Sequence, residues 1–357
     1  MKVIFGAEIW DLQNQGGISR YFYELIIRLA DLETFQVSVI KPKQDTNPFW
    51  KMLSKQERIT LLGEIPENGQ NAVYHPTYYS RANIALARCK SYSIALTIFD
   101  LISENNENLW GKIRRRNIDK VFAIKNADLI ICISSTTEKD LHKHYSNVIG
   151  TTTVIHLASS FMLHKSSISD FSERRNQIVY VGKRHGYKNF IQLLHAFKNL
   201  SAEDDSLRLM LCGGEPYSKE ELQIIEEHSL ENRIFRSFPT DSELTNVYRN
   251  SKLLVSTSRM EGFGLPLIEA AASGCLVVCS DIEIYREIVN GIAHFFPIND
   301  SSKLQYLIAS LLYSKREHRK EIERNLIEIR SRYSWSSLVS KTAESYLNIS
   351  KGNKLAQ

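Results

Sequence analysis

Two glutamates, Glu261 and Glu269, bracket the run Gly262-Phe263-Gly264-Leu265-Pro266 and are separated by seven residues. The apolar, β-prone run 252–257 before them predicts a buried strand. The two glycines allow backbone amides to approach a ligand closely, and Pro266 suits the first position of a helix. A strand, a glycine turn and a helix N-terminus can bind a diphosphate, while the carboxylates can accept hydrogen bonds from hydroxyl groups. The pattern indicates a sugar-nucleotide site. The alternative is that a glutamate only complements the helix dipole and that the glycines only form a turn.

A basic loop follows the predicted strand 178–181 at the start of the second half of the chain. It runs Gly182-Lys183-Arg184-His185-Gly186-Tyr187-Lys188 and ends at Asn189, a residue type that can cap the next helix. Arginine forks onto phosphate oxygens and lysine acts as a compact positive charge, so the loop can bind a diphosphate. A solvated basic loop is the alternative that the residues themselves leave open.

Further candidates stand where other predicted strands end. The residue types are small, aromatic or polar, which suits close approach to a ligand or hydrogen bonding to a sugar, but each is also common in turns and cores. In the first half they are Gly16, Gly17, His75, Tyr78 and Asp100, and in the second half they are Gly213 and Phe238.

These runs, in this order, resemble the retaining glycosyltransferases of family 4, which have the GT-B fold and carry the signature E-x7-E. The resemblance implies that Arg184 and Lys188 bind the donor diphosphate, with Lys183 as the alternative to Arg184. It also implies that Glu261 orients the donor sugar and that Glu269 holds the ribose hydroxyls.

The same resemblance assigns the remaining candidates. Gly16 and Gly17 are similar to the loop that family members place against the donor phosphate, and Gly213 and Phe238 to the lining of the base and ribose pocket. The run that contains His75 and Tyr78 looks like the H-P-T-Y-Y of bacterial polysaccharide mannosyltransferases, so both are candidate acceptor or sugar contacts, together with Asp100. One position departs from the family: many relatives have His-Asp where this chain has Phe99-Asp100, and phenylalanine cannot hydrogen-bond a hydroxyl.

Strand-like and helix-like segments alternate along the 357 residues, which is the α/β pattern. We expect a GT-B fold of two Rossmann-like, doubly wound domains that face a cleft, with a C-terminal helix that crosses back to the first domain. The expected divisions are an acceptor-side domain at 1–165, a nucleotide-sugar domain at 166–332, and a crossover helix and tail at 333–357. The polar, serine-rich segment 162–176 is the expected linker.

Composition limits the class of protein. With 43% hydrophobic and 24% charged residues the chain can bury large cores, and its net charge of +5 does not indicate nucleic-acid binding. The five cysteines are scattered through apolar segments without zinc spacing, which indicates reduced thiols in the cytoplasm. Runs 49–55 and 110–120 are basic and aromatic and could contact a membrane-held lipid-linked glycan, or could simply be a solvated surface.

The resulting hypothesis is a retaining hexosyltransferase that needs neither cofactor nor metal. Its partners would be a nucleoside diphosphate sugar, with GDP-mannose as the first expectation, and a glycan or lipid-linked oligosaccharide acceptor. We expect it in the cytoplasm, on the inner face of the membrane, in surface-polysaccharide or O-antigen assembly. A sugar-nucleotide epimerase or hydrolase, or a non-catalytic sugar-nucleotide binder, are the alternatives.

Overall fold

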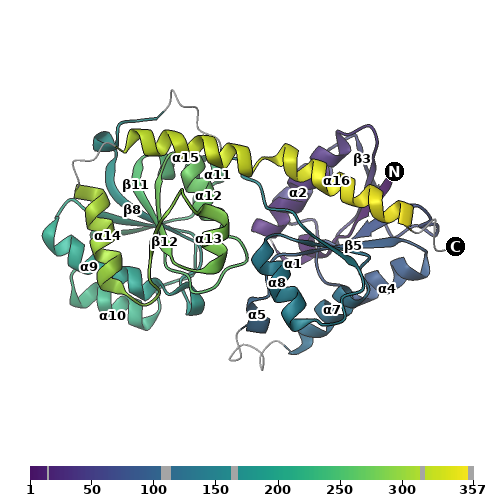
Figure 1. The fold of residues 1–357 in the computed structure, drawn as a ribbon, viewed down its shortest axis with the longest axis horizontal. Helices are drawn as coiled ribbons and strands as arrows, with labels where there is room; N and C mark the ends of the chain where they lie inside the picture. The colour runs from purple at the N-terminus through teal and green to yellow at the C-terminus, as the bar shows by residue number, and fades with distance from the viewer. Residues whose placement is uncertain (14–15, 106–113, 162–167, 314–317, 353–357) are drawn as a thin grey trace. The chain divides into compact units, whose positions relative to one another are not determined.

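The computed structural model describes residues 1–13, 16–105, 114–161, 168–313 and 318–352. The chain forms two compact units (Figure 1). Unit 1 contains Met1–Leu157 together with Trp335–Gln357, and unit 2 contains Ala158–Ser334. The boundary expected at 165/166 falls in the segment 162–167, outside the described residues.

Unit 1 is built on a parallel seven-stranded sheet in the order β3-β2-β1-β4-β5-β6-β7. Its strands are β1 (Lys2–Phe5), β2 (Gln36–Ile40), β3 (Ile59–Leu62), β4 (Ala72–His75), β5 (Ser93–Ile98), β6 (Leu129–Cys132) and β7 (Thr151–Val154). Its helices are α1 (Glu8–Leu12), α2 (Gly17–Ala30), α3 (Pro48–Leu53), α4 (Arg81–Cys89), α5 (Ile102–Asn105), α7 (Arg114–Lys125), α8 (Ser135–His144) and α16 (Trp335–Gly352). The order reverses direction between β1 and β4, the doubly wound topology expected of a Rossmann-like domain.

The last helix, α16, belongs to unit 1 although it follows unit 2 in the chain (Figure 1). It contacts α2 and the strands β4, β5 and β6. Leu338, Val339 and Tyr346 are buried there, and the Tyr346 hydroxyl lies 2.5 Å from Nδ1 of His75. The crossover predicted for the C-terminal helix is therefore confirmed, and the helix completes the core of unit 1.

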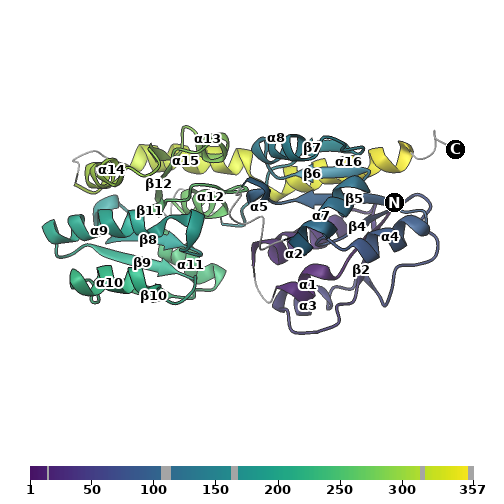
Figure 2. The same ribbon diagram turned by 90° about the horizontal axis from the view of Figure 1, so that it is seen from below.

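Unit 2 is built on a parallel six-stranded sheet in the order β10-β9-β8-β11-β12-β13. Its strands are β8 (Arg175–Val181), β9 (Arg208–Cys212), β10 (Ile234–Ser237), β11 (Ser251–Ser256), β12 (Leu276–Ser280) and β13 (His294–Phe296). Its helices are α9 (Phe190–Glu203), α10 (Lys219–Glu227), α11 (Asp241–Arg249), α12 (Leu265–Ala272), α13 (Glu283–Val289), α14 (Ser301–Tyr313) and α15 (Arg319–Arg332), with short 3-10 turns at Phe171–Glu173 and Gly186–Lys188. Helices α9, α10 and α14 lie on one side of the sheet and α11, α12, α13 and α15 on the other (Figures 1 and 2).

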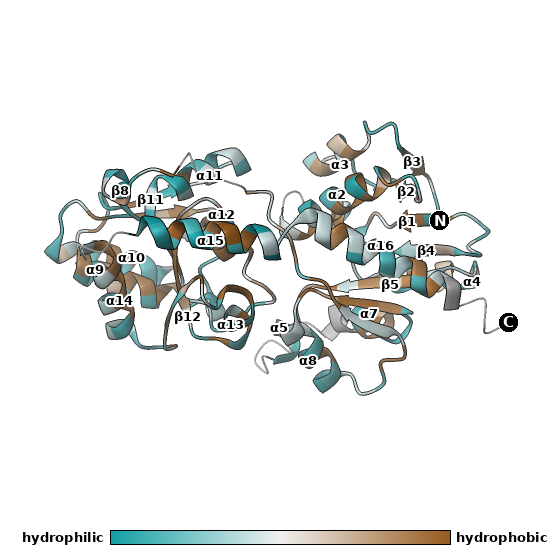
Figure 3. Ribbon diagram, turned by 45° about the horizontal axis from the view of Figure 1, so that its top comes forward, coloured by the Kyte–Doolittle hydropathy of each residue, from teal (hydrophilic) through white to brown (hydrophobic). Residues whose placement is uncertain are grey.

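The inner strands are apolar along their length because helices cover both faces of each sheet. Every residue of β5, β6 and β12 is buried, and β11 and β12 are coloured as hydrophobic in Figure 3. This pattern made most strands recognisable in the sequence. Within the described residues, no helix is both long and apolar enough to cross a bilayer.

Candidate functional site

The site in unit 2 is formed by two loops that leave neighbouring strands. The strand order reverses between β8 and β11, and in open parallel sheets ligands bind outside the carboxyl ends of the strands at such a point. The loop after β8 is held to the loop after β11 by two hydrogen bonds. The Thr257 hydroxyl donates to the carbonyl of Lys188 at 2.9 Å, and the Arg259 amide donates to the carbonyl of Tyr187 at 2.7 Å. The two motifs found in the sequence are therefore brought together.

The carboxylate of Glu261 is fixed at one of its two oxygens. Oε1 accepts hydrogen bonds from Lys188 Nζ at 2.5 Å, from the Ser258 hydroxyl at 2.7 Å and from the Tyr285 hydroxyl at 3.4 Å. Oε2 receives no hydrogen bond from the residues that the structure describes, and the side chain is 14% exposed. The glutamate thus presents one well-oriented acceptor oxygen next to a cation.

Tyr285 of α13 supports both ends of the turn that follows Glu261. Its hydroxyl is 2.7 Å from the Ser256 hydroxyl, and burial, with the charge of Glu261 nearby, raises the pKa of Tyr285 well above its usual value. The phenol therefore stays protonated and can donate. The Tyr285 ring also leaves no room for a side chain at position 264, because a Cβ on Gly264 would lie 2.8 Å from the ring. In addition, Gly264 has φ +105°, a backbone conformation that favours glycine.

Helix α12 begins at Leu265, directly after this turn, with Pro266 in its first turn. Its N-terminal amides suit an anion, as the sequence predicts. Two nearby side chains are buried. Glu269 lies beyond the first turn and is buried, and the Phe263 ring packs edge-on against Tyr333 at 5.8 Å, so this side chain is part of the core.

The expectation that the Arg184 side chain binds the donor diphosphate is wrong, because its guanidinium is buried in an ion pair. Arg184 Nε lies 2.7 Å from Oε1 of Glu221, with the side chains 0% and 2% exposed. Nη2 donates to the carbonyl of Glu215. Glu221 also caps α10 by accepting from the Ser218 amide at 2.6 Å. A charge neutralised inside unit 2 cannot reach a ligand outside it, so Arg184 has a structural role.

Lys183, the alternative cation, is exposed. Its backbone is held because its carbonyl accepts a hydrogen bond from Tyr180 at 2.8 Å. The carboxylate of Glu215 accepts from the Arg184 amide at 2.9 Å, and this bond helps keep the pKa of Glu215 below its usual value although partial burial opposes it. The loop thus turns Arg184 inward and Lys183 outward, which leaves Lys183 and Lys188 as its accessible cations.

Gly213 and Phe238 follow β9 and β10, on the other side of β8 from the E-x7-E loop. Gly213 has φ +77°, and no atom outside its immediate chain neighbours lies within 4 Å of a Cβ built there. Phe238 is 72% exposed, with the Arg236 guanidinium 5.7 Å from its ring. An open backbone and an exposed aromatic face are compatible with the predicted nucleoside contacts. Asn189 stands at the N-cap of α9, but its side chain makes no capping hydrogen bond.

In unit 1 the paired glycines lie at the start of α2. Gly16 is the N-cap and Gly17 the first helical residue, and the Ser19 hydroxyl donates to the carbonyl of Gly16 at 2.9 Å. The glycines follow β1, which neighbours β4 at the point where the strand order reverses. Their position matches the sequence expectation for a ligand-binding end of the sheet.

His75 is a core residue, contrary to the expectation of a sugar or acceptor contact. It is 0% exposed, its Nε2 lies 3.0 Å from the Thr97 hydroxyl, and its ring stacks on Phe5 at 5.6 Å. With Tyr346 at Nδ1, both nitrogens have partners. Burial lowers the pKa of His75 to about 3, so the ring stays neutral. The histidine ties the sheet to α16.

The other predicted contact residues of unit 1, Tyr78 and Asp100, lie just after the ends of β4 and β5. Tyr78 is half-buried, with its ring 4.8 Å from that of Tyr79. Asp100 is also half-buried and accepts from the Ile102 amide at 3.3 Å. Phe99, which replaces the family histidine, packs against Tyr21 at 5.2 Å between ring centroids. The aromatic side chain is thus used in packing rather than in hydrogen bonding.

Sequence reasoning missed Glu8, the first residue of α1, which lies three residues after the end of β1. Its carboxylate accepts from Tyr74 at 3.0 Å, from the Thr77 amide at 3.0 Å and from Asn83 at 2.7 Å. A carboxylate after a predicted strand was the available signal. Among the described residues, no group of three or more His, Cys, Asp or Glu side chains is placed to hold a metal ion.

Comparison with known proteins identifies the second half of the chain. Residues 164–328 match the family model described as "Glycosyl transferases group 1". Over these residues the chain is therefore similar to group 1 glycosyltransferases. The match covers the loops that hold Lys188 and Glu261, so both motifs lie within the matched segment.

Two similar curated proteins are mannosyltransferases by name. Over 184 residues, 50% of each chain, this chain is 29% identical to the O-antigen chain mannosyltransferase RfbU of Salmonella typhimurium, so the match spans half the length of that relative. It is 28% identical to O-antigen chain mannosyltransferase B of Escherichia coli over 97% of this chain and 99% of that one. Anabaena HepE in complex with UDP and glucose has a similar structure, with a TM-score of 0.71 at 16% identity over 97% of this chain and 99% of that one. The predicted GT-B fold is confirmed.

Proposed function

We propose that the protein is a retaining, metal-independent hexosyltransferase that moves mannose from GDP-mannose to a lipid-linked glycan acceptor in bacterial surface-polysaccharide assembly. The names of the mannosyltransferase relatives support the sugar. Cytoplasmic location at the inner face of the membrane follows from the same proposal, since the acceptor lipid resides there. The geometry around Glu261 carries the proposal.

Glu261 is the group that would orient the donor sugar. Three donors converge on its Oε1, among them Lys188 at 2.5 Å, so the carboxylate cannot turn freely. Oε2 is then held in a set direction, where it can accept hydrogen bonds from sugar hydroxyls. A fixed negative charge beside the ring would also stabilise the positive charge that develops at the anomeric carbon.

The leaving diphosphate would bind where positive charge is already placed. Lys188, the exposed Lys183 and the first amides of α12 supply that charge without reorganisation, which is the main way enzymes stabilise a leaving anion. The bond between the anomeric carbon and the diphosphate oxygen breaks as the acceptor hydroxyl attacks from the same face. The proton of that hydroxyl passes to the departing phosphate oxygen. In this proposal the two lysines stabilise the negative charge of the leaving diphosphate, a role that a divalent cation has in other enzymes.

The proposal is tested with Glu261→Gln, with Glu231→Gln as the matched control on an exposed loop of the same unit. We expect mannose transfer from GDP-mannose to an isoprenoid-linked glycan to fall about 100-fold in kcat for Glu261→Gln. Binding of GDP, measured by thermal shift, should stay unchanged in both variants. Unchanged turnover in Glu261→Gln would refute the role of the carboxylate.

The same assays separate the alternatives. Retention is read from the anomeric configuration of the product, and metal independence from turnover that persists with excess EDTA. If UDP stabilises the protein more than GDP does, the donor is a UDP-sugar instead, as the similar HepE complex with UDP suggests. Epimerised or hydrolysed donor without acceptor would favour an epimerase or hydrolase, and binding without any turnover a non-catalytic binder.

A further inference from the structure

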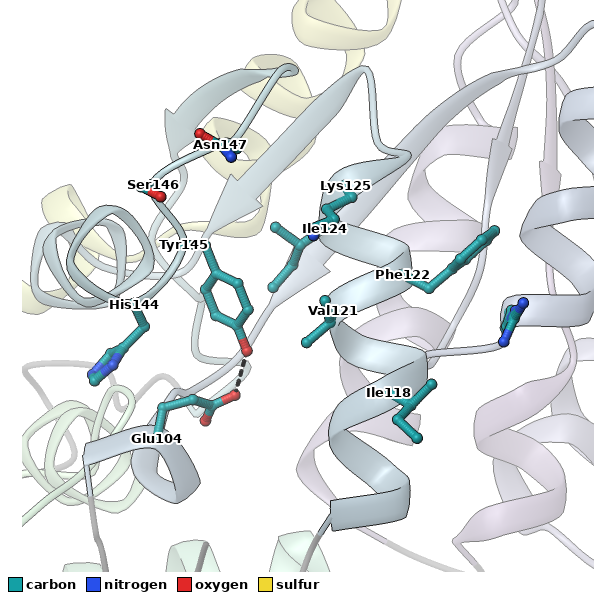
Figure 4. Close-up of a pocket in the computed structure, with 11 residues that line it drawn as sticks. Glu104, Ile118, Val121, Phe122, Ile124, Lys125, His144, Tyr145, Ser146 and Asn147 are labelled. Carbon is teal, nitrogen blue, oxygen red and sulfur yellow. Dashed lines mark hydrogen bonds between the residues drawn. The ribbon is translucent and has the colours of Figure 1, made fainter.

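Unit 1 contains a pocket away from the residues assigned so far. Its volume is about 690 Å³, within the roughly 300–1,000 Å³ range of ligand pockets. Helix α7 contributes Ile118, Val121, Phe122 and Ile124 to the lining, and Tyr145 faces them from the end of α8 (Figure 4). Most of this lining is hydrocarbon, which suits an apolar ligand.

The acidic group in the pocket is already neutralised. Glu104 forms an ion pair with Lys120 at 2.9 Å, with side chains 1% and 7% exposed, and accepts from the Tyr145 hydroxyl at 2.8 Å (Figure 4). The nearby charge of Lys120 keeps the pKa of Glu104 below its usual value although burial opposes it. The pair leaves no net charge at this end of the pocket.

The remaining charges that line the pocket are positive. Arg81 and Lys125 are exposed, and neither forms an ion pair with a residue that the structure describes. The Arg81 guanidinium lies 5.3 Å from the ring of Phe122, so a cation stands directly beside the apolar lining. Outside the pocket, Ile149 lies two residues after the lining residue Asn147 and is 85% exposed.

We propose that this pocket binds the lipid carrier of the acceptor, an isoprenoid chain that ends in a phosphate group. The chain would lie on Ile118 and Val121, and the phosphate would accept hydrogen bonds from Arg81 and Lys125. Hydrocarbon beside unpaired cations matches an anionic amphiphile and fits neither a free sugar nor a neutral lipid. This inference rests on the proposed function and names the part of the acceptor that unit 1 recognises.

The test uses farnesyl phosphate as the probe and the full chain as the protein. Ile118 is 54% exposed, so Ile118→Glu places a charge in the pocket without disturbing the core, and Ile149→Glu is the matched control outside the lining. We expect Ile118→Glu and Arg81→Gln each to weaken binding about tenfold, a loss of about 1.4 kcal/mol. Ile149→Glu should bind like the parent protein, and farnesol and inorganic phosphate should each bind more weakly than farnesyl phosphate.

Three results would overturn the inference. In the first, farnesyl phosphate does not bind. In the second, Ile149→Glu weakens its binding as much as Ile118→Glu does. In the third, the protein floats with phosphatidylglycerol vesicles, and adding isoprenyl phosphate to the vesicles does not increase the bound fraction. The last result would indicate a general membrane contact. GDP and UDP thermal shifts on the same samples keep the two proposals apart, because a protein that binds nucleotide but not farnesyl phosphate loses only this inference.

Discussion

Two adjacent cations, Lys183 and Arg184, provide the sharpest test of how the donor loop works. Replacing each by methionine keeps the length of the side chain and removes its charge. The structure predicts opposite outcomes, because Arg184 is buried against Glu221 and Lys183 is exposed. One variant should lose stability and the other should lose affinity for nucleotide.

The magnitudes follow from burial. In Arg184→Met, Oε1 of Glu221 loses its partner inside unit 2, which costs about 3–5 kcal/mol. For a domain of this size that lowers the melting temperature by roughly 10 °C. Lys183→Met should change stability by less than about 0.5 kcal/mol. It removes one charged hydrogen bond to the diphosphate, which weakens binding about 10- to 100-fold.

The assay is thermal and urea unfolding of the full chain, followed by titration with GDP and UDP at a temperature where each variant is folded. Adding Glu221→Gln to Arg184→Met removes the unpaired charge and should recover about 2 kcal/mol. The Gln side chain can still accept from the Ser218 amide. Tenfold weaker nucleotide binding in Arg184→Met at unchanged melting temperature would show that the arginine reaches the ligand after all.

Two further predictions concern His75 and Gly264. Since His75 has a pKa of about 3 in the folded protein and about 6.5 when unfolded, the unfolded chain binds more protons between these values. Stability of unit 1 should therefore fall as pH drops from 6.5 towards 3, and His75→Gln should flatten this slope in acid titrations followed by fluorescence. Gly264→Ala combines a disfavoured φ with a contact to Tyr285, so it should cost about 1–3 kcal/mol and reduce transfer. Unchanged melting and turnover in that variant would contradict the constraint on the turn.

Local patterns predicted much of the fold. Helices on both faces make the inner strands apolar, so the runs 178–181 and 252–257 predicted β8 and β11. Shorter or more polar elements were missed, such as β3 at Ile59–Leu62 and α15 at Arg319–Arg332. Their helical or extended state is set by neighbours in space, for example the contact of α15 with α12.

The site was predictable where a motif is local and unpredictable where partners are distant. Lys188 and Glu261 were found because each stands in a recognisable loop after a strand. Tyr285 could not be assigned to Glu261, because nothing in a short segment of α13 shows which carboxylate its hydroxyl reaches. Arg184 was misassigned for the same reason: sequence shows a cation in a loop but not the buried Glu221 that neutralises it.

The placement of α16 affects the order in which the protein can form during synthesis on the ribosome. Unit 1 starts at Met1 but needs residues after Trp335, including Tyr346 against His75, to close its interior. Unit 2, which is one continuous stretch, emerges whole before that. The usual order from N-terminal to C-terminal domain is therefore reversed, because unit 1 is completed only after α16 has been translated.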